Sequence, residues 1–165
     1  MNPVHLKHYG KELKQTKNMN LLFTKIIICY LLFQTTVSKT NYLLTDGFVA
    51  SGYDVVSYFS QNPKLGNNAF IAEYEHVKFK FSSLENLNIF KSNPLKYIPK
   101  YGGWCAYAIG LNGSKVTVEP KNYRIYNNEL FLFYKKNRND TLQDWLKNEK
   151  ELYQKAEINW LKNKK

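Results

Sequence analysis

The chain has 165 residues, the length of one domain or of one domain with a tail. Its residues are 44% hydrophobic and 16% aromatic, which is enough for a packed core and excludes a wholly disordered chain. Two cysteines exclude a disulfide-rich scaffold and a four-cysteine zinc site, and three histidines argue against a histidine-rich metal site. The formal net charge is +11, but the lysines are scattered and only Arg124 and Arg138 are arginine, so we expect no nucleic-acid partner.

The N-terminal segment has the pattern of a secretory signal peptide. Residues 1–18 are polar and basic, residues 26–33 form a short apolar run, and small residues lead to Ser38. We therefore expect residues 1–38 to be a cleaved signal peptide, with residues 1–18 as an upstream extension before a start at Met19. The mature chain would be secreted or periplasmic and would lack a transmembrane span. An uncleaved N-terminal anchor is the alternative.

Cleavage after Ser38 would change the chemistry that the remaining chain can perform. It removes five of the 24 basic residues and one of the 13 acidic residues, which leaves a net charge of +7. It also leaves one cysteine, Cys105, and one histidine, His76. No intramolecular disulfide is then possible, so the thiol is either buried and inert, paired with another molecule, or available for chemistry.

The first half of the expected mature chain predicts short extended and helical pieces. Residues 41–51 predict an extended lead-in, and residues 54–59 predict one or two helical turns with Asp54 as the N-cap. Apolar and polar residues alternate over residues 69–82, which predicts a β-hairpin with His76 at its tip.

The second half adds helices around another hairpin. Ser82 and Glu85 have the spacing of a capping box, and a helix follows them. Residues 104–109 predict a brief helix, and residues 123–134 predict a second β-hairpin around an Asn-Asn turn. Residues 139–163 predict a cap and one long amphipathic helix. The expected fold is a small single α+β domain with two β-hairpins, short central helices and a long C-terminal helix.

The order of several segments resembles one protein family. The opening Gly-Tyr-Asp-Val-Val-Ser-Tyr-Phe at residues 52–59 is similar to the Gly-Tyr-Asp-Pro-Val-Ala-Tyr-Phe motif of exported bacterial YHS domain-containing proteins. The other matching segments are residues 73–81, 83–97, 99–108, 119–134 and 156–160. The resemblance covers residues 46–160 and implies that residues 39–165 form a YHS-like domain. The wider family includes cysteine-bearing metal-binding modules, but here Ser82 and Ser83 occupy the junction where those modules place a cysteine.

Cys105 is the strongest candidate for a metal-binding or reactive residue. It follows Gly102 and Gly103, whose amides could face an anion, and it begins a predicted helix. Both features favour a thiolate, which could bind a soft metal ion such as copper or act as a nucleophile. The alternative is a buried cysteine that packs as a small apolar residue.

Other residues could complete a site around this thiol. His76 is the candidate second metal ligand, although a hairpin tip is usually solvated. The candidate cofactor-binding residues are Tyr53, Asp54, Tyr101, Gly102, Gly103 and Tyr107. Asp54 could instead serve only as a cap, and the tyrosines could form a core edge with hydrogen-bonded hydroxyl groups. No catalytic motif is recognisable.

We therefore expect an exported YHS-like binding module for a metal ion or small cofactor near Cys105, and not an enzyme. Two alternatives remain open at this point. One is a thiol-redox enzyme that uses Cys105, and the other is a protein-interaction domain without a small-molecule site.

Overall fold

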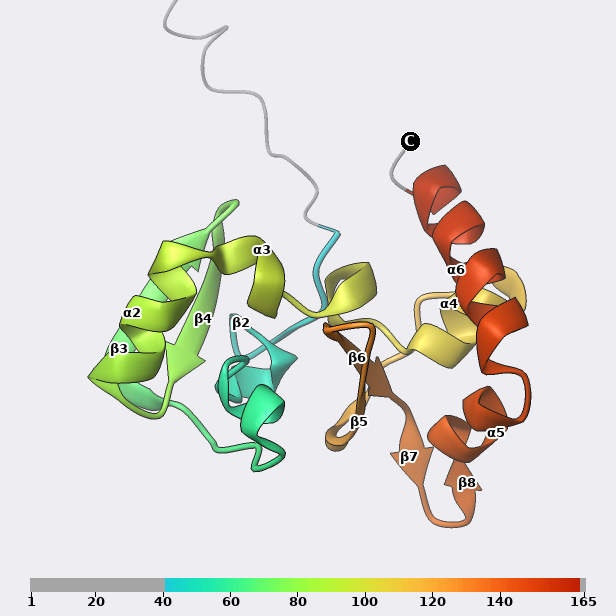
Figure 1. The fold of residues 1–165 in the computed structure, drawn as a ribbon, viewed down its shortest axis with the longest axis horizontal. Helices are drawn as coiled ribbons and strands as arrows, with labels where there is room; N and C mark the ends of the chain where they lie inside the picture. Colours follow the sequence, from blue (N-terminus) through green and yellow to red (C-terminus); the bar gives the residue numbers. More distant parts are fainter. Residues whose placement is uncertain (1–40, 164–165) are drawn as a thin grey trace, which may run out of the picture. The chain divides into compact units, whose positions relative to one another are not determined.

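The computed structural model describes residues 41–163 (Figure 1). The signal peptide predicted over residues 1–38 lies outside the described residues. No helix within residues 41–163 combines the length and the apolar character that a bilayer span requires. The described residues form a mixed α+β structure with hairpin sheets and a long C-terminal helix, which confirms the predicted fold class.

The elements are short, and η marks a 3-10 helix. The first half contains β1 (Leu44–Thr45), β2 (Phe48–Val49), η1 (Ala50–Gly52), η2 (Ser57–Ser60), β3 (Asn67–Tyr74), β4 (Val77–Phe81), α2 (Leu84–Ser92) and α3 (Pro94–Tyr97). The second half contains η3 (Lys100–Gly103), α4 (Ala106–Asn112), β5 (Glu119–Tyr126), β6 (Glu129–Phe133), β7 (Lys135–Lys136), β8 (Asn139–Asp140), α5 (Thr141–Lys147) and α6 (Glu149–Asn163).

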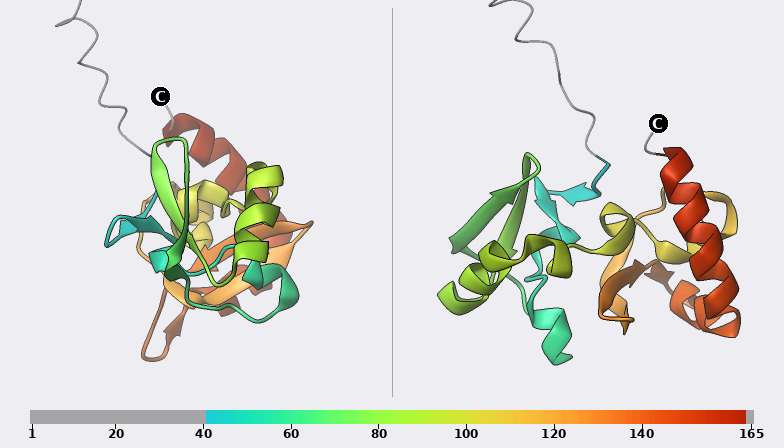
Figure 2. Two further views of the ribbon diagram at one scale, coloured as in Figure 1. Left: turned by 90° about the vertical axis from the view of Figure 1, so that its left-hand side faces the viewer. Right: turned by 45° about the horizontal axis from the view of Figure 1, so that its top comes forward.

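The predicted first hairpin is the antiparallel pair β3–β4. Its turn residues Glu75 and His76 both have positive φ, 48° and 63°, which suits the tight turn of a two-residue hairpin. The hairpin belongs to a sheet with the order β1-β2-β4-β3, in which β2 runs parallel to β4. Helix α2 packs against β3 and β4 (Figure 2).

The cap of α2 differs from the prediction by one residue. Ser83 is the N-cap, and its hydroxyl accepts a hydrogen bond from the amide of Asn86 at 3.1 Å. The capping box predicted from Ser82 is therefore wrong. The Ser82 hydroxyl does not cap the helix but donates a hydrogen bond to the Asp54 carboxylate at 2.6 Å.

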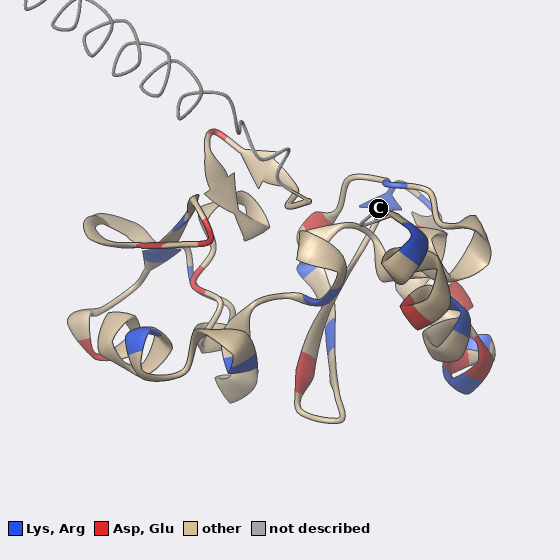
Figure 3. Ribbon diagram, turned by 90° about the horizontal axis from the view of Figure 1, so that it is seen from above, with Lys and Arg blue, Asp and Glu red and all other residues tan. Residues whose placement is uncertain are grey.

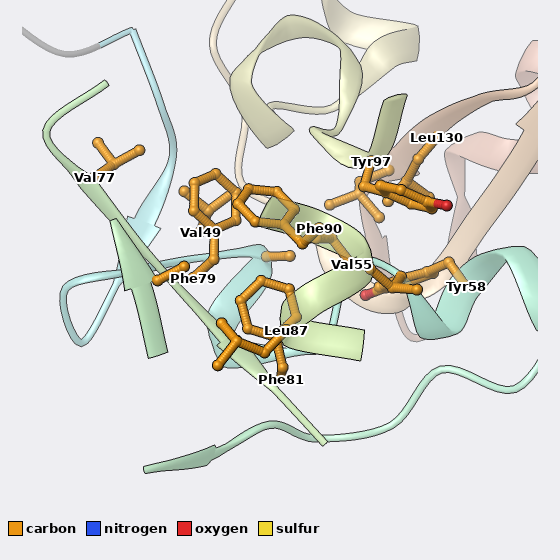
Figure 4. Packing of buried hydrophobic residues seen from close by; sticks show 14 residues of the cluster. Val49, Val55, Tyr58, Val77, Phe79, Phe81, Leu87, Phe90, Tyr97 and Leu130 are labelled. Carbon is orange, nitrogen blue, oxygen red and sulfur yellow. The ribbon is translucent and has the colours of Figure 1, made fainter. Parts of the chain in front are cut away.

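A first core forms between this sheet and α2. The rings of Phe79 and Phe81 lie 4.8 and 5.0 Å from the ring of Phe90, measured between centroids (Figure 4). Leu130 and Leu132 of β6 belong to the same cluster. The side chains of this core are almost completely buried, so hydrophobic burial is its main stabilising force.

The predicted second hairpin, β5–β6, separates this core from a second one. Its turn residues Asn127 and Asn128 have φ of 49° and 60°, which confirms the Asn-Asn turn. Phe131 and Phe133 point away from Leu130 and Leu132 and join a second cluster with α4, α5 and α6. Because successive strand residues face opposite sides, the apolar run of β6 supplies side chains to both cores.

The C-terminal helical segment is broken at Asn148. The single helix predicted over residues 139–163 is instead α5 and α6, because Asn148 has φ −143° and ψ 41°. Asp140, in β8, caps α5 by accepting from the amide of Leu142 at 3.2 Å. Glu149 stabilises the break, since its carboxylate accepts from the indole of Trp145 at 3.0 Å and pairs with Arg124.

The segment at Asn41–Leu43 lies against η3. The amide of Leu43 donates to the Gly102 carbonyl at 2.8 Å, and the indole of Trp104 donates to the Asn41 carbonyl at 2.9 Å. Gly102 has φ 62°, and a Cβ at this position would lie 2.4 Å from the Asn41 oxygen. Glycine is therefore required here both for the backbone conformation and for the close approach.

We predict that Gly102→Ala destabilises the fold more than Gly47→Ala. Gly47 also has positive φ, 80°, but a Cβ added there would meet nothing within 4 Å, so its replacement costs only the backbone strain of about 1 kcal/mol. Gly102→Ala adds the clash with Asn41, for a total of about 2–4 kcal/mol. Urea denaturation followed by circular dichroism measures both, and equal losses would contradict the close approach.

Candidate functional site

Cys105 lies at the N-terminus of α4 with its side chain fully buried. The Tyr134 amide donates to Sγ at 3.4 Å, and Sγ lies 3.4 Å from the Thr141 hydroxyl oxygen. The Thr141 hydroxyl donates its proton to the Tyr134 carbonyl at 2.8 Å, so in the contact with Cys105 the S–H is the donor. The sulfur thus uses both its donor and its acceptor capacity to connect α4, the end of β6 and α5.

This environment differs from the one that the sequence favoured. The Cys105 amide donates to the Val116 carbonyl at 3.0 Å, and α4 has only seven residues. The thiol faces neither solvent nor an open anion site. Its contacts match the alternative stated from the sequence, a buried cysteine that packs in the core.

His76 lies at the turn of the β3–β4 hairpin and is exposed. Figure 1 shows this hairpin apart from α4, whose N-cap is Cys105. Within residues 41–163, no group of three or more His, Cys, Asp or Glu side chains could hold a metal ion. The structure therefore does not bring His76 and Cys105 together into a ligand set.

The glycine pair and the neighbouring tyrosines are part of the packing around η3. Gly102 and Gly103 are buried, and Asn41 covers Gly102. The Tyr101 hydroxyl donates to the Glu157 carboxylate at 3.0 Å. Burial raises the pKa of Tyr101, and the negative charge of Glu157 raises it further. Tyr107 is half-buried against the second core.

Asp54 is a fully buried carboxylate that accepts five hydrogen bonds. Oδ1 accepts from the amides of Val56 at 3.0 Å and Ser57 at 3.3 Å. Oδ2 accepts from the Ser82 amide at 2.8 Å, the Ser82 hydroxyl at 2.6 Å and the Asn86 side-chain amide at 2.7 Å. Asp54 thus closes the turn before η2, and it also fixes the junction between β4 and α2. The N-cap of η2 itself is Val56, so the predicted assignment of Asp54 as the N-cap of this helix is wrong.

The predicted cofactor-binding residues fall into two groups. Tyr53 and Asp54 are associated with the first core, where Tyr53 is half-buried and forms an isolated backbone bridge with Leu65. Tyr101, Gly102, Gly103 and Tyr107 lie around η3 and α4. The two groups share no hydrogen-bond partner among the contacts described for residues 41–163.

Sequence reasoning missed a cleft between α3 and the β5–β6 turn. The cleft has a volume of about 420 Å³. Asn93, Leu95, Lys96 and Ile98 line the side formed by α3 and its flanking residues. Lys100, Asn127, Asn128 and Glu129 line the other side. The sequence signals were the Asn93-Pro94 and Asn127-Asn128 turns, but neither indicates that the two turns lie together.

The charges in the cleft differ in how far they are neutralised. Lys100 lies 3.1 Å from Glu129 and 3.0 Å from Glu157. Burial alone would lower the pKa of Lys100, but the hydrogen bonds to the two carboxylates outweigh burial and raise the pKa. Lys96 instead lies over the ring of Tyr97 at 5.1 Å, and no described carboxylate pairs with it. Elsewhere, as along α6, basic and acidic residues are interspersed (Figure 3).

Comparisons with protein family models, with curated proteins and with solved structures found no match to this chain. The YHS-like character of residues 39–165 therefore stays a prediction from the sequence motifs.

We predict that Asp54→Asn destabilises the protein by about 2–4 kcal/mol. The substitution keeps the shape but turns one acceptor oxygen into a donor group among groups that already donate, and hydrogen bonds to charged groups contribute about 1.5–3 kcal/mol each. Asp46→Asn is the matched control, because Asp46 is exposed, and it should stay within about 0.5 kcal/mol of the parent. Urea denaturation provides the measurement. If Asp54→Asn does not fold, Ser82→Ala tests the same cluster, and an unchanged stability in Ser82→Ala would contradict it.

We also predict that Cys105 resists a thiol reagent while the protein is folded. A Cys29→Ala background leaves Cys105 as the one thiol. The rate of labelling by a disulfide reagent should be limited by opening of the core. Urea should therefore increase this rate in parallel with unfolding. Labelling of the folded protein as fast as that of the unfolded chain would show that the sulfur is accessible.

Proposed function

We propose that this chain is an exported, non-catalytic YHS-like binding module that binds a partner protein through the cleft between α3 and the β5–β6 turn. Export and the YHS-like character come from the sequence patterns. The observation that carries the proposal is the exposed, mixed polar and apolar lining of the cleft, together with the sealed environment of Cys105.

The buried sulfur argues against the other two functions considered from the sequence. A metal ion or a small cofactor at Cys105 would have to displace Tyr134 and Thr141, both of which hydrogen-bond to the sulfur. Thiol redox chemistry needs an accessible sulfur, and Cys105 has none of its surface exposed. A structural role accounts for each contact of this residue without a ligand.

The cleft has the mixture of groups that suits a polypeptide ligand. Leu95 is 73% exposed and Ile98 is half-buried, so together they offer an apolar contact area. Asn127 and Asn128 present carboxamides at the opposite side. A carboxamide carries both a donor and an acceptor, which matches the N–H and C=O groups of an extended peptide.

The proposal predicts that Leu95→Asp abolishes selection of short peptides from a displayed random library. The substitution removes an apolar residue that lines the cleft and costs about 1–3 kcal/mol of binding free energy. Leu65→Asp is the matched control, because Leu65 is 66% exposed but lies outside the cleft.

Peptides selected on the parent protein should bind Leu65→Asp as well as the parent and should lose affinity for Leu95→Asp in fluorescence polarisation. If no peptide is selected, or if the peptides bind all three proteins equally, the cleft is not the binding site.

A further inference from the structure

We infer that the partner segment bound in this cleft is acidic, with a carboxylate placed against Lys96. The inference rests on the proposed function, because it specifies the chemistry of the ligand for the same cleft. It follows from the distribution of charge and of polar groups among the residues that line the cleft.

The two lysines of the cleft are not equivalent. Lys100 is held between Glu129 and Glu157, and the Tyr153 hydroxyl donates to Glu129 at 3.2 Å. Glu129, the only acidic residue that lines the cleft in the described part of the chain, is thus already paired with Lys100 and hydrogen-bonded by Tyr153. Within residues 41–163, the ammonium group of Lys96 contacts the ring of its neighbour Tyr97 and no carboxylate, so it can accept one without breaking an ion pair.

The amide groups around Lys96 support the same orientation. No side-chain hydrogen bond engages Asn93 in capping α3, and Asn127 and Asn128 are exposed at their turn. These groups can bind the main chain of an extended segment while Lys96 binds its side chain. A basic segment would instead place a cation beside Lys96, with Glu129 already paired to Lys100.

The net charge of residues 39–165 favours the same class of partner. Residues 39–165 carry a formal charge of +7, which attracts acidic segments and repels basic ones during encounter. This long-range attraction acts on the association rate, whereas Lys96 provides the local contact that selects the position of the carboxylate.

A charge-reversal experiment tests the inference. The probes are peptides selected on the parent protein and their amidated counterparts, in which every Asp is replaced by Asn and every Glu by Gln. The variant is Lys96→Glu, and the control is Lys91→Glu, an equal change of net charge at an exposed position of α2.

Lys96→Glu should weaken acidic peptides about fivefold or more while leaving the amidated peptides within about twofold, and added salt should reduce this difference. Lys91→Glu should weaken the acidic peptides by no more than about twofold.

Equal losses in the two variants, or a selected pool without Asp and Glu, would overturn the acidic preference. In that case the Leu95→Asp result still reports separately on whether the cleft binds peptides at all.

Discussion

The carboxylate of Asp54 is the interaction on which the first half of the described structure depends. A buried negative charge is costly unless it is satisfied, and no described cation pairs with this one. Five donors from two separate segments take that role instead. The turn before η2 and the start of α2 therefore depend on each other, because both must be folded to supply these donors. Their relative position places the aromatic side chains of β4 against Phe90 of α2.

The second organising constraint is strand β6. Its uninterrupted apolar run places Leu130 and Leu132 in one core and Phe131 and Phe133 in the other. A strand with one solvated face would alternate polar and apolar residues, whereas this run has both faces covered. The β5–β6 hairpin thus lies between the two cores and contributes side chains to both. Cys105 packs where the N-terminus of α4 meets the end of β6.

Local patterns predicted local structure well and long-range partners poorly. The first hairpin follows from period-two alternation, and the second follows from two β-prone runs around Asn127-Asn128, since asparagine tolerates the positive φ of the turn. The cap of α2 could not be assigned between Ser82 and Ser83, because the choice depends on Asp54, which is 28 residues away from Ser82. The break at Asn148 likewise depends on Arg124 from a distant strand.

The same limit applies to the candidate site. A cysteine after two glycines at a helix start has the sequence features of an activated thiol, but its surroundings come from Tyr134 and Thr141, which no local pattern connects to it. The cleft was missed for the related reason that its two sides lie far apart in the sequence. The order of the sequence motifs resembles that of a YHS-like domain, while the surface proposed to bind a partner is a property of the tertiary structure.

The strap formed by Asn41–Leu43 links the beginning of the described region to its interior. The carbonyl of Asn41 holds the indole of Trp104, and the same residue closes the space above Gly102. A protease that removed Asn41 would leave the Trp104 indole without its hydrogen-bond acceptor and would expose the backbone of η3 to water. Cleavage after Ser38 would keep Asn41–Leu43 but would leave only two residues before Asn41. The position of cleavage would therefore decide whether η3 and Trp104 keep their contacts with this segment.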